Sequence, residues 1–154
     1  MTKVMFVCHG NICRSPMAEF VFKDIVAKQN LSNEFIIDSS ATSREEIGNG
    51  IHYGTRAKLI EKNIPFDDHH AVQFTKKDYN DYDYILLMDR NNLRNITRII
   101  GEDTENKIHL LLDFASGGDI ADPWYTGNFD DTYRDIVEGC AAFLEYLRNN
   151  KCIR

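Results

Sequence analysis

Residues 3–16, KVMFVCHGNICRSP, decide the fold that this chain adopts. The first part, Lys3–Val7, is mostly apolar and rich in β-branched and aromatic side chains, which predicts a short buried strand. Pro16 suits the first turn of a helix, because that turn does not need its backbone N–H. Beyond it, apolar residues recur at helical spacing at Ala18, Val21, Phe22 and Ile25. We therefore expect a strand, a short loop and a helix in immediate succession.

Strands and helices continue to alternate along the rest of the chain. Short apolar segments predict strands at Phe35–Ser39, Tyr84–Met88 and Ile108–Leu112, with a brief fifth strand at Ala71–Phe74. Helical spacing marks two later helices, one through Leu93, Ile96 and Ile100 and one through Ile136, Cys140, Phe143, Leu144 and Leu147. This order predicts a single-domain α/β fold, with a parallel sheet covered by helices on both faces. Ligands bind such sheets at the carboxyl ends of the strands, so we expect the site just after Val7.

The composition argues against several classes of protein. The chain has 154 residues and no repeat or linker long enough to divide it, which predicts one domain over residues 1–154. Its formal net charge of -6, with no run of lysine or arginine, argues against nucleic acid as a partner. No apolar run is long enough to span a membrane and no signal-peptide pattern is present. We expect a cytoplasmic protein without membrane partners, with its four cysteines reduced.

The loop after the first strand has the residues of a nucleophilic site that binds an anion. Backbone N–H groups converge at the start of a helix, and Cys8 faces them from the end of the strand. A helix N-terminus beside a fixed cation stabilises a thiolate, which is a strong nucleophile. Arg14 supplies a planar guanidinium that can bind two phosphoryl oxygens. The alternative is that Cys8 is a small buried core residue and Arg14 a surface side chain.

The other residues of this loop have supporting roles in the same interpretation. Gly10 permits a tight, left-handed turn, and Asn11 holds the loop through side-chain hydrogen bonds to the backbone. Ser15 can cap the helix and can donate its hydroxyl to the Cys8 sulfur. His9 either lines the entrance of the site or is simply solvated.

The chain resembles a known family at these residues. Residues 8–19, CHGNICRSPMAE, look like the signature loop of the low-molecular-weight protein tyrosine phosphatases, and residues 122–125, DPWY, look like their second signature. The resemblance implies a four-stranded parallel sheet, and hydrolysis of phosphomonoesters through a cysteinyl-phosphate without a metal or other cofactor. It also implies phosphotyrosine-containing proteins or small aryl phosphates as substrates. We expect a monomer, with weak self-association left open.

Asp122 is the candidate general acid. Hydrolysis needs a carboxyl group that protonates the leaving oxygen and later activates water. The Asp-Pro pair favours an extended or turn conformation, in a loop that follows a predicted strand at the active-site edge of the sheet. Because such pairs are common in ordinary turns, the resemblance adds much of the support. Asp119 is the nearest competitor.

Aromatic and acidic residues are the candidate walls of the substrate pocket. Trp124 and Tyr125 suit stacking on a phenyl ring, with core packing as the alternative. Vertebrate members of the family carry an aromatic residue where Glu45 or Glu46 stands here, which leaves a preference for bulky aromatic substrates open. Ile12 favours phosphotyrosine, because members that act on phosphoarginine resemble this loop but carry threonine at that position.

Cys13 and the paired histidines have their own predictions. Family members with the same second cysteine imply that Cys13 pairs with Cys8 when the thiolate is oxidised. A histidine near His69 in the family braces the residue that matches Asn11. Adjacent histidines on an extended segment, such as His69 and His70, point in opposite directions, and no zinc-binding spacing accompanies them. We therefore expect no metal site.

Two other functions share parts of this pattern. A thioredoxin-coupled arsenate reductase of the same fold requires further redox cysteines after the third helix, but residues 14–139 contain none. A non-catalytic phosphopeptide-binding module would use Arg14 and the loop amides without needing Cys8 or Asp122. Since both residues are present, the sequence favours the phosphatase.

Overall fold

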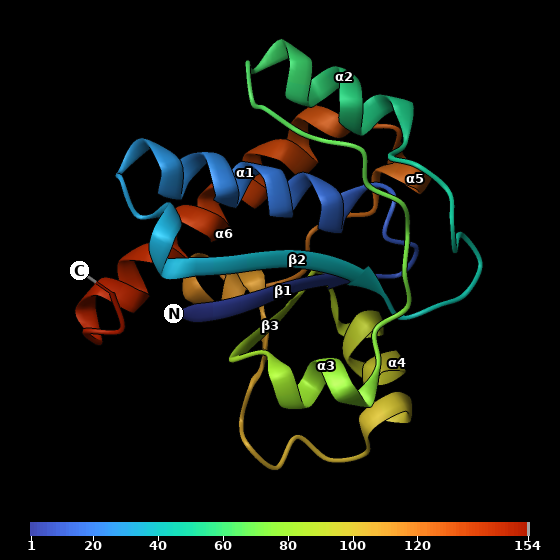
Figure 1. The fold of residues 1–154 in the computed structure, drawn as a ribbon. Helices are drawn as coiled ribbons and strands as arrows, with labels where there is room; N and C mark the ends of the chain where they lie inside the picture. Colours follow the sequence, from blue (N-terminus) through green and yellow to red (C-terminus); the bar gives the residue numbers. More distant parts are fainter. Residues whose placement is uncertain (154) are drawn as a thin grey trace.

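A computed structural model describes residues 1–153 as three layers of secondary structure (Figure 1). Four parallel strands form one sheet in the order β2-β1-β3-β4, with β1 at Thr2–Cys8, β2 at Phe35–Ala41, β3 at Tyr84–Leu87 and β4 at Ile108–Leu110. One side carries α1 (Arg14–Lys28), α2 (Tyr53–Glu61), α5 (Pro123–Thr126) and α6 (Phe129–Asn149). The other side carries α3 (Lys76–Asp81) and α4 (Arg90–Ile100). The predicted parallel sheet with helices on both faces is confirmed.

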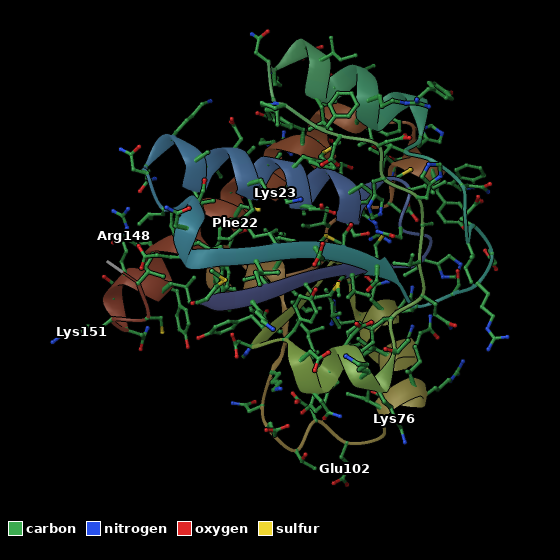
Figure 2. The ribbon with its side chains drawn as sticks, in the orientation of Figure 1. Phe22, Lys23, Lys76, Glu102, Arg148 and Lys151 are labelled. Atoms are coloured by element: carbon green, nitrogen blue, oxygen red, sulfur yellow. The ribbon has the colours of Figure 1, made fainter. Side chains whose placement is uncertain are left out.

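The sheet is buried on both faces, which explains why its strands are nearly continuous apolar runs. Phe6 of β1 packs against Phe22 of α1 with ring centroids 5.8 Å apart, and Phe22 also meets Phe143 of α6 at 5.5 Å. The side chain of Phe22 lies between α1 and the sheet (Figure 2). Val7, which points to the opposite face, packs in a second cluster with Ile96 of α4. Packing on both faces fixes the position of β1 and therefore of the loop that follows it.

The parallel register brings the loops that carry the site to one edge of the sheet. Cys8 ends β1 directly beside Ala41, the last residue of β2. The segment that follows the 3₁₀ turn η2 (Leu111–Phe114) returns to the same edge, where the backbone N–H of Ile120 donates a 2.8 Å hydrogen bond to the carbonyl of Met88. Residues after β1, β2, β3 and η2 therefore face one another.

The predicted fifth strand at Ala71–Phe74 is wrong. This segment makes only one isolated bridge with the sheet, between Gln73 and Ala41. The backbone N–H of Val72 donates a hydrogen bond to the side chain of Asn11, in the loop after β1, and not to a neighbouring strand. The segment therefore supports the site and does not extend the sheet.

The predicted strand at Ile108–Leu112 stops earlier, at Leu110, and the chain continues as the turn η2. This turn lies against α6 so closely that a Cβ atom added at Gly139 would lie 2.6 Å from Leu111.

The helices marked by spacing are confirmed as α1, α4 and α6, whereas no periodicity predicted α2, α3 or α5. Within residues 1–153, no helix combines the length and apolar character that crossing a bilayer requires.

Candidate active site

The loop between β1 and α1 turns at Asn11, whose φ of 60° is left-handed. Gly10 was predicted to supply this turn, but its φ is not positive. Asparagine tolerates the left-handed region better than most residues because its short polar side chain bonds locally. Here its side-chain amide donates to Ser15 Oγ at 2.7 Å and to Ser39 Oγ at 3.0 Å. The turn is therefore fixed by buried hydrogen bonds rather than by the freedom of glycine.

The other end of the Asn11 side chain holds the loop to its surroundings. Its carbonyl oxygen lies 2.8 Å from His69 Nε2 and accepts a 3.2 Å hydrogen bond from the backbone N–H of Val72. The predicted contact between His69 and Asn11 is therefore confirmed. His70 points elsewhere, to the carbonyl of Gly48. Within residues 1–153, no group of three metal-ligating side chains converges.

The Cys8 sulfur is surrounded by hydrogen-bond donors. The backbone N–H groups of Asn11 and Ser15 point at Sγ from 3.3 and 3.4 Å, and Ser15 Oγ lies 3.0 Å from it. The Ser15 hydroxyl has two acceptors within reach, the Cys8 sulfur at 3.0 Å and the Ser40 carbonyl at 3.4 Å, and a thiolate at the closer position is the stronger acceptor. These three donors stabilise negative charge on Sγ. The predicted capping role of Ser15 is wrong, since Cys13 occupies the N-cap and Ser15 lies in the first turn of α1.

Arg14 is held in the cavity by acidic and carbonyl groups. Its side chain is only 2 % exposed, and Nη1 donates to Asp89 Oδ2 at 2.7 Å and to the carbonyl of Ile120 at 2.8 Å. Nη2 lies 3.4 Å from Asp122 Oδ2. Burial opposes the charge, but the negative charges of Cys8, Asp122 and Asp89 outweigh it and raise the pKa of Arg14 above its ordinary value. The guanidinium is therefore a permanent, oriented cation beside the sulfur.

Asp122 lies at the start of the short helix α5 and faces Arg14. Its Oδ1 accepts a 3.0 Å hydrogen bond from the backbone N–H of Trp124, which leaves Oδ2 directed at the cavity. Asp119 is directed elsewhere, since its carboxylate accepts from the backbone N–H of Arg90 and lies 3.5 Å from the guanidinium Nε of that residue. The geometry favours Asp122 over Asp119 as the acid that faces Cys8.

Cys8, Arg14 and Asp122 line one cavity of about 100 Å³. Its lining residues are Cys8, His9, Gly10, Ile12, Cys13, Arg14, Glu45, Glu46, Asp122, Trp124 and Tyr125. Trp124 is 57 % exposed and Tyr125 is 82 % exposed, so these rings form walls and are not packed in the core. His9 Nε2 lies 2.9 Å from Glu45 Oε2, which places His9 at the entrance rather than free in solvent.

Ile12 and Cys13 are the last two residues of the loop before α1, and both are buried. Ile12 is 9 % exposed, and its carbonyl accepts a 2.8 Å hydrogen bond from the backbone N–H of His52. The Cys13 carbonyl accepts from Thr55 Oγ1 at 3.1 Å, which ties α2 to the loop. Burial, helped by the charge of Cys8, raises the pKa of the Cys13 thiol to about 12. Both residues therefore contact the site, but only Cys8 is surrounded by charge-stabilising donors.

Three residues that support the site were not predicted as members of it. Asp89 follows β3 at the active-site edge and holds Arg14, while Glu19 and Ser39 lie behind the loop. Ser39 Oγ donates to Glu19 Oε1 at 2.6 Å and receives the Asn11 amide on its other side. The position of Asp89 at a strand end was a usable signal. Glu19 lay within a helix with no such signal, since only the fold shows that this carboxylate points inward.

Comparisons with known proteins agree on one family. The family model described as low molecular weight phosphotyrosine protein phosphatase matches residues 3–152. The low molecular weight protein-tyrosine-phosphatase YfkJ of Bacillus subtilis is 40 % identical, over 98 % of this chain and 99 % of that protein, and its crystal structure matches with a TM-score of 0.94. The human low molecular weight phosphotyrosine protein phosphatase is 43 % identical over 92 % of this chain and 93 % of its own length. A crystal structure of a low molecular weight protein tyrosine phosphatase from Streptococcus pyogenes is 44 % identical and covers 96 % of this chain and 93 % of that one, with a TM-score of 0.86.

Proposed function

Because the chain belongs to the low molecular weight phosphotyrosine protein phosphatase family and is a protein tyrosine phosphatase, we propose that Cys8, Arg14 and Asp122 carry out its reaction. One observation carries the assignment. The Cys8 sulfur faces three hydrogen-bond donors in the same cavity as a buried guanidinium and a carboxyl group.

The first step transfers the phosphoryl group to the enzyme. The Cys8 thiolate attacks phosphorus, so a sulfur–phosphorus bond forms while the bond to the tyrosyl oxygen breaks. Asp122, protonated at this stage, gives its proton to the departing phenolate oxygen. Arg14 and the loop N–H groups bind the equatorial oxygens, where negative charge is spread in the transition state.

The second step releases phosphate. Asp122, now a carboxylate, takes a proton from water while the water oxygen attacks phosphorus. The sulfur–phosphorus bond breaks and the electron pair returns to Cys8, whose charge is again stabilised by Ser15 and the loop amides. Each residue is therefore restored after one turnover, and no step needs a metal or a cofactor.

The pocket supports aryl phosphates as substrates. Trp124 and Tyr125 stand at the mouth of the cavity, where they can stack on the phenyl ring of phosphotyrosine. His9, Gly10, Asn11, Ile12, Cys13 and Ser15 provide or position the loop around the phosphate. His9 and Glu45, which lie 2.9 Å apart, add a polar pair to the lining of the same cavity. We therefore propose phosphotyrosine in proteins and small aryl phosphates as substrates, rather than bulky aromatic esters.

The alternative enzyme, an arsenate reductase, has less support. An arsenate reductase needs further redox thiols, but among residues 1–153 only Cys13 shares the cavity with Cys8, and Cys140 is fully buried in α6. We propose that the protein works as a monomer. Because Cys8 must stay reduced to react, we also propose that it works in a reducing compartment such as the cytoplasm. The net charge of -6 argues against nucleic acid as a partner, because it repels the phosphate backbone.

The test is a comparison of kcat/KM for phosphotyrosine, phosphoserine and phosphoarginine in the presence of a chelator. We expect phosphotyrosine to be preferred, and Cys8→Ser to abolish turnover while orthovanadate still binds. Cys152→Ser, which changes an exposed thiol far along the chain, is the matched control and should keep full activity. Activity in Cys8→Ser, or a preference for phosphoarginine, would contradict the proposal.

A further inference from the structure

A second cavity lies between α1, the 3₁₀ turn η1 (Ser32–Glu34), β2 and the segment that follows α2. Its volume is about 540 Å³, compared with about 100 Å³ for the catalytic cavity, and the two share no lining residue. That volume lies within the range of about 300–1,000 Å³ that is usual for small-molecule sites. The proposed reaction uses none of this space.

The lining of the second cavity combines an apolar floor with charged side chains. The apolar residues include Phe20, Val26, Phe35, Ile37, Pro65 and Phe66. Phe20 and Phe66 meet edge to face with ring centroids 6.1 Å apart, which leaves an aromatic corner in the wall. A flat ring or a short alkyl chain is therefore the shape that this floor accommodates.

The charges at this cavity favour a cation as the occupant. Lys23, on α1 (Figure 2), is already paired with the buried carboxylate of Glu19 at 2.6 Å. Asp24 is paired with Lys28 at 2.8 Å. Among residues 1–153, no hydrogen bond or ion pair neutralises the exposed carboxylate of Asp67. The uncompensated charge is therefore negative.

We propose that this cavity binds small aromatic or alkyl amines, with the apolar part on Phe20 and Phe66 and the ammonium group beside Asp67. We also propose that an occupant lowers the activity of the catalytic site. Lys23, which lines the cavity, connects it to the catalytic loop. Its Nζ lies 5.2 Å from the Phe20 ring centroid and is also paired with Glu19. A ligand on the Phe20 ring takes the ring face near Lys23 Nζ, and its ammonium group repels that nitrogen, so the pairing of Lys23 with Glu19 weakens.

A continuous chain of hydrogen bonds joins Glu19 to the nucleophile. It runs through Ser39, Asn11 and Ser15 to Cys8, with donor–acceptor distances of 2.6, 3.0, 2.7 and 3.0 Å. If Glu19 loses its cation, the negative potential behind the loop grows, which disfavours the Cys8 thiolate. Because the substrate pocket itself is not occupied, the ligand should lower kcat with little change in KM.

Binding can be measured with 1-naphthylmethylamine as the probe and 1-naphthylacetate as its anionic counterpart. We expect the amine to shift the backbone NMR signals of α1 around Phe20 and those of Phe66, with orthovanadate saturating the catalytic cavity throughout. The acid should bind at least about threefold more weakly, because its charge is repelled by Asp67. Shifts confined to residues around Cys8, equal binding of amine and acid, or no binding of the amine would overturn the proposal.

Matched variants test the location of the site. Ala27→Trp places a large ring at the exposed mouth of the cavity and should abolish amine binding. Ala57→Trp, at an exposed helical alanine that lies outside this cavity, should leave binding unchanged. Asp67→Asn should weaken binding and remove its salt dependence, whereas Asp68→Asn should not. Undiminished binding in Ala27→Trp would contradict this location.

The catalytic effect has a separate readout, because the binding measurements do not depend on the roles assigned to Cys8, Arg14 and Asp122. With p-nitrophenyl phosphate as substrate, saturating amine should lower kcat of the wild type by at least about twofold at constant KM. The Ala27→Trp variant should show no such inhibition. A rise in KM alone would indicate competition at the catalytic cavity, and unchanged kcat at saturation would overturn the proposed coupling.

Discussion

Arg14 Nη1 donates a 2.7 Å hydrogen bond to Asp89 Oδ2 in a pair that is largely shielded from solvent. The same carboxylate begins a helix, since Asp89 Oδ1 accepts a 2.8 Å hydrogen bond from the backbone N–H of Asn92 at the start of α4. One residue at the end of β3 therefore positions the guanidinium and starts the next helix. Asp89 contacts Arg14 and does not line the cavity around Cys8, so it acts as a positioning residue.

Replacement of Asp89 separates these two roles. Asparagine can still cap α4, so Asp89→Asn should keep the fold but lose the charge that orients Arg14. We expect kcat/KM for phosphotyrosine to fall by about 10²-fold, because a misplaced clamp loses its alignment with the phosphoryl oxygens. Asp119→Asn at the same edge should change it little. Equal losses in the two variants would show that Asp89 is not special to the site.

The acid role of Asp122 predicts a dependence on the leaving group. Asp122→Asn should lower kcat/KM by about 10²–10⁴-fold with phosphotyrosine, whose phenolate needs a proton to leave in the first step. The loss should shrink with aryl phosphates whose leaving groups are weaker bases. A plot of log kcat/KM against leaving-group pKa for both enzymes gives the answer, because kcat/KM reports the step in which the leaving group departs. Parallel plots would mean that Asp122 has a structural role.

His52 predicts a pH dependence of stability. Its Nδ1 accepts a 3.0 Å hydrogen bond from the N–H of Gly54, and its ring stacks on Phe129 with centroids 5.4 Å apart and meets Trp124 edge-on at 5.7 Å. Burial and the charge of Arg56 lower the pKa of His52 below its ordinary 6.5, although Asp122 and Glu46 act in the opposite direction.

The sign of the effect follows from proton uptake. Below pH 6.5 the unfolded chain protonates this histidine while the folded chain resists, so stability is lost as the pH falls from 6.5 toward the lowered pKa of the folded state. Asparagine can accept the Gly54 hydrogen bond but does not titrate. Thermal unfolding at about pH 7.5 and about pH 5.5 should therefore show a larger drop in Tm for the wild type than for His52→Asn. Identical drops would contradict the prediction.

Cys13 predicts recovery from oxidation. Peroxide converts the Cys8 thiolate to a sulfenic acid, and attack by the Cys13 sulfur then forms a disulfide and releases water. Loss of the Cys8 charge removes one of the causes that raise the pKa of Cys13, which makes this thiol easier to ionise once Cys8 is oxidised. After peroxide and then dithiothreitol, activity should return in the wild type and in Cys152→Ser but not in Cys13→Ser. Equal recovery in all three would remove Cys13 from this role.

The strands and helices that have a clear apolar pattern in the sequence could be predicted from it. The apolar run at Lys3–Val7 and the helical spacing after Pro16 placed β1 and α1, and therefore located the loop between them. The long helix α6 followed from its apolar stripe, whose marker residues are all buried. In contrast, α2 has too few apolar positions for a periodic signal, and it is held by contacts such as that of Thr55 with the Cys13 carbonyl.

Details that depend on tertiary partners could not be read from the sequence. Ser15 is a good capping residue, but the Cys8 sulfur and Asn11 bind its hydroxyl instead. Gly10 is the residue best suited to a left-handed turn, yet Asn11 adopts it because Ser39 and His69 satisfy its side chain. The turn at Asn11 thus depends on residues 28 and 58 positions away in the chain, and the contacts of Ser15 depend on how that turn closes the loop.

The most direct test of the mechanism is to trap the intermediate on Cys8. Acid quenching during turnover of an aryl phosphate with a good leaving group, followed by peptide mass spectrometry, measures where the phosphoryl group is bound. Asp122→Asn should increase the trapped amount, because the same residue activates water in the second step. We predict a phosphoryl group on the Cys8 sulfur and none in Cys8→Ser. Turnover with an unmodified Cys8, or with the phosphoryl group on another residue, would contradict the mechanism.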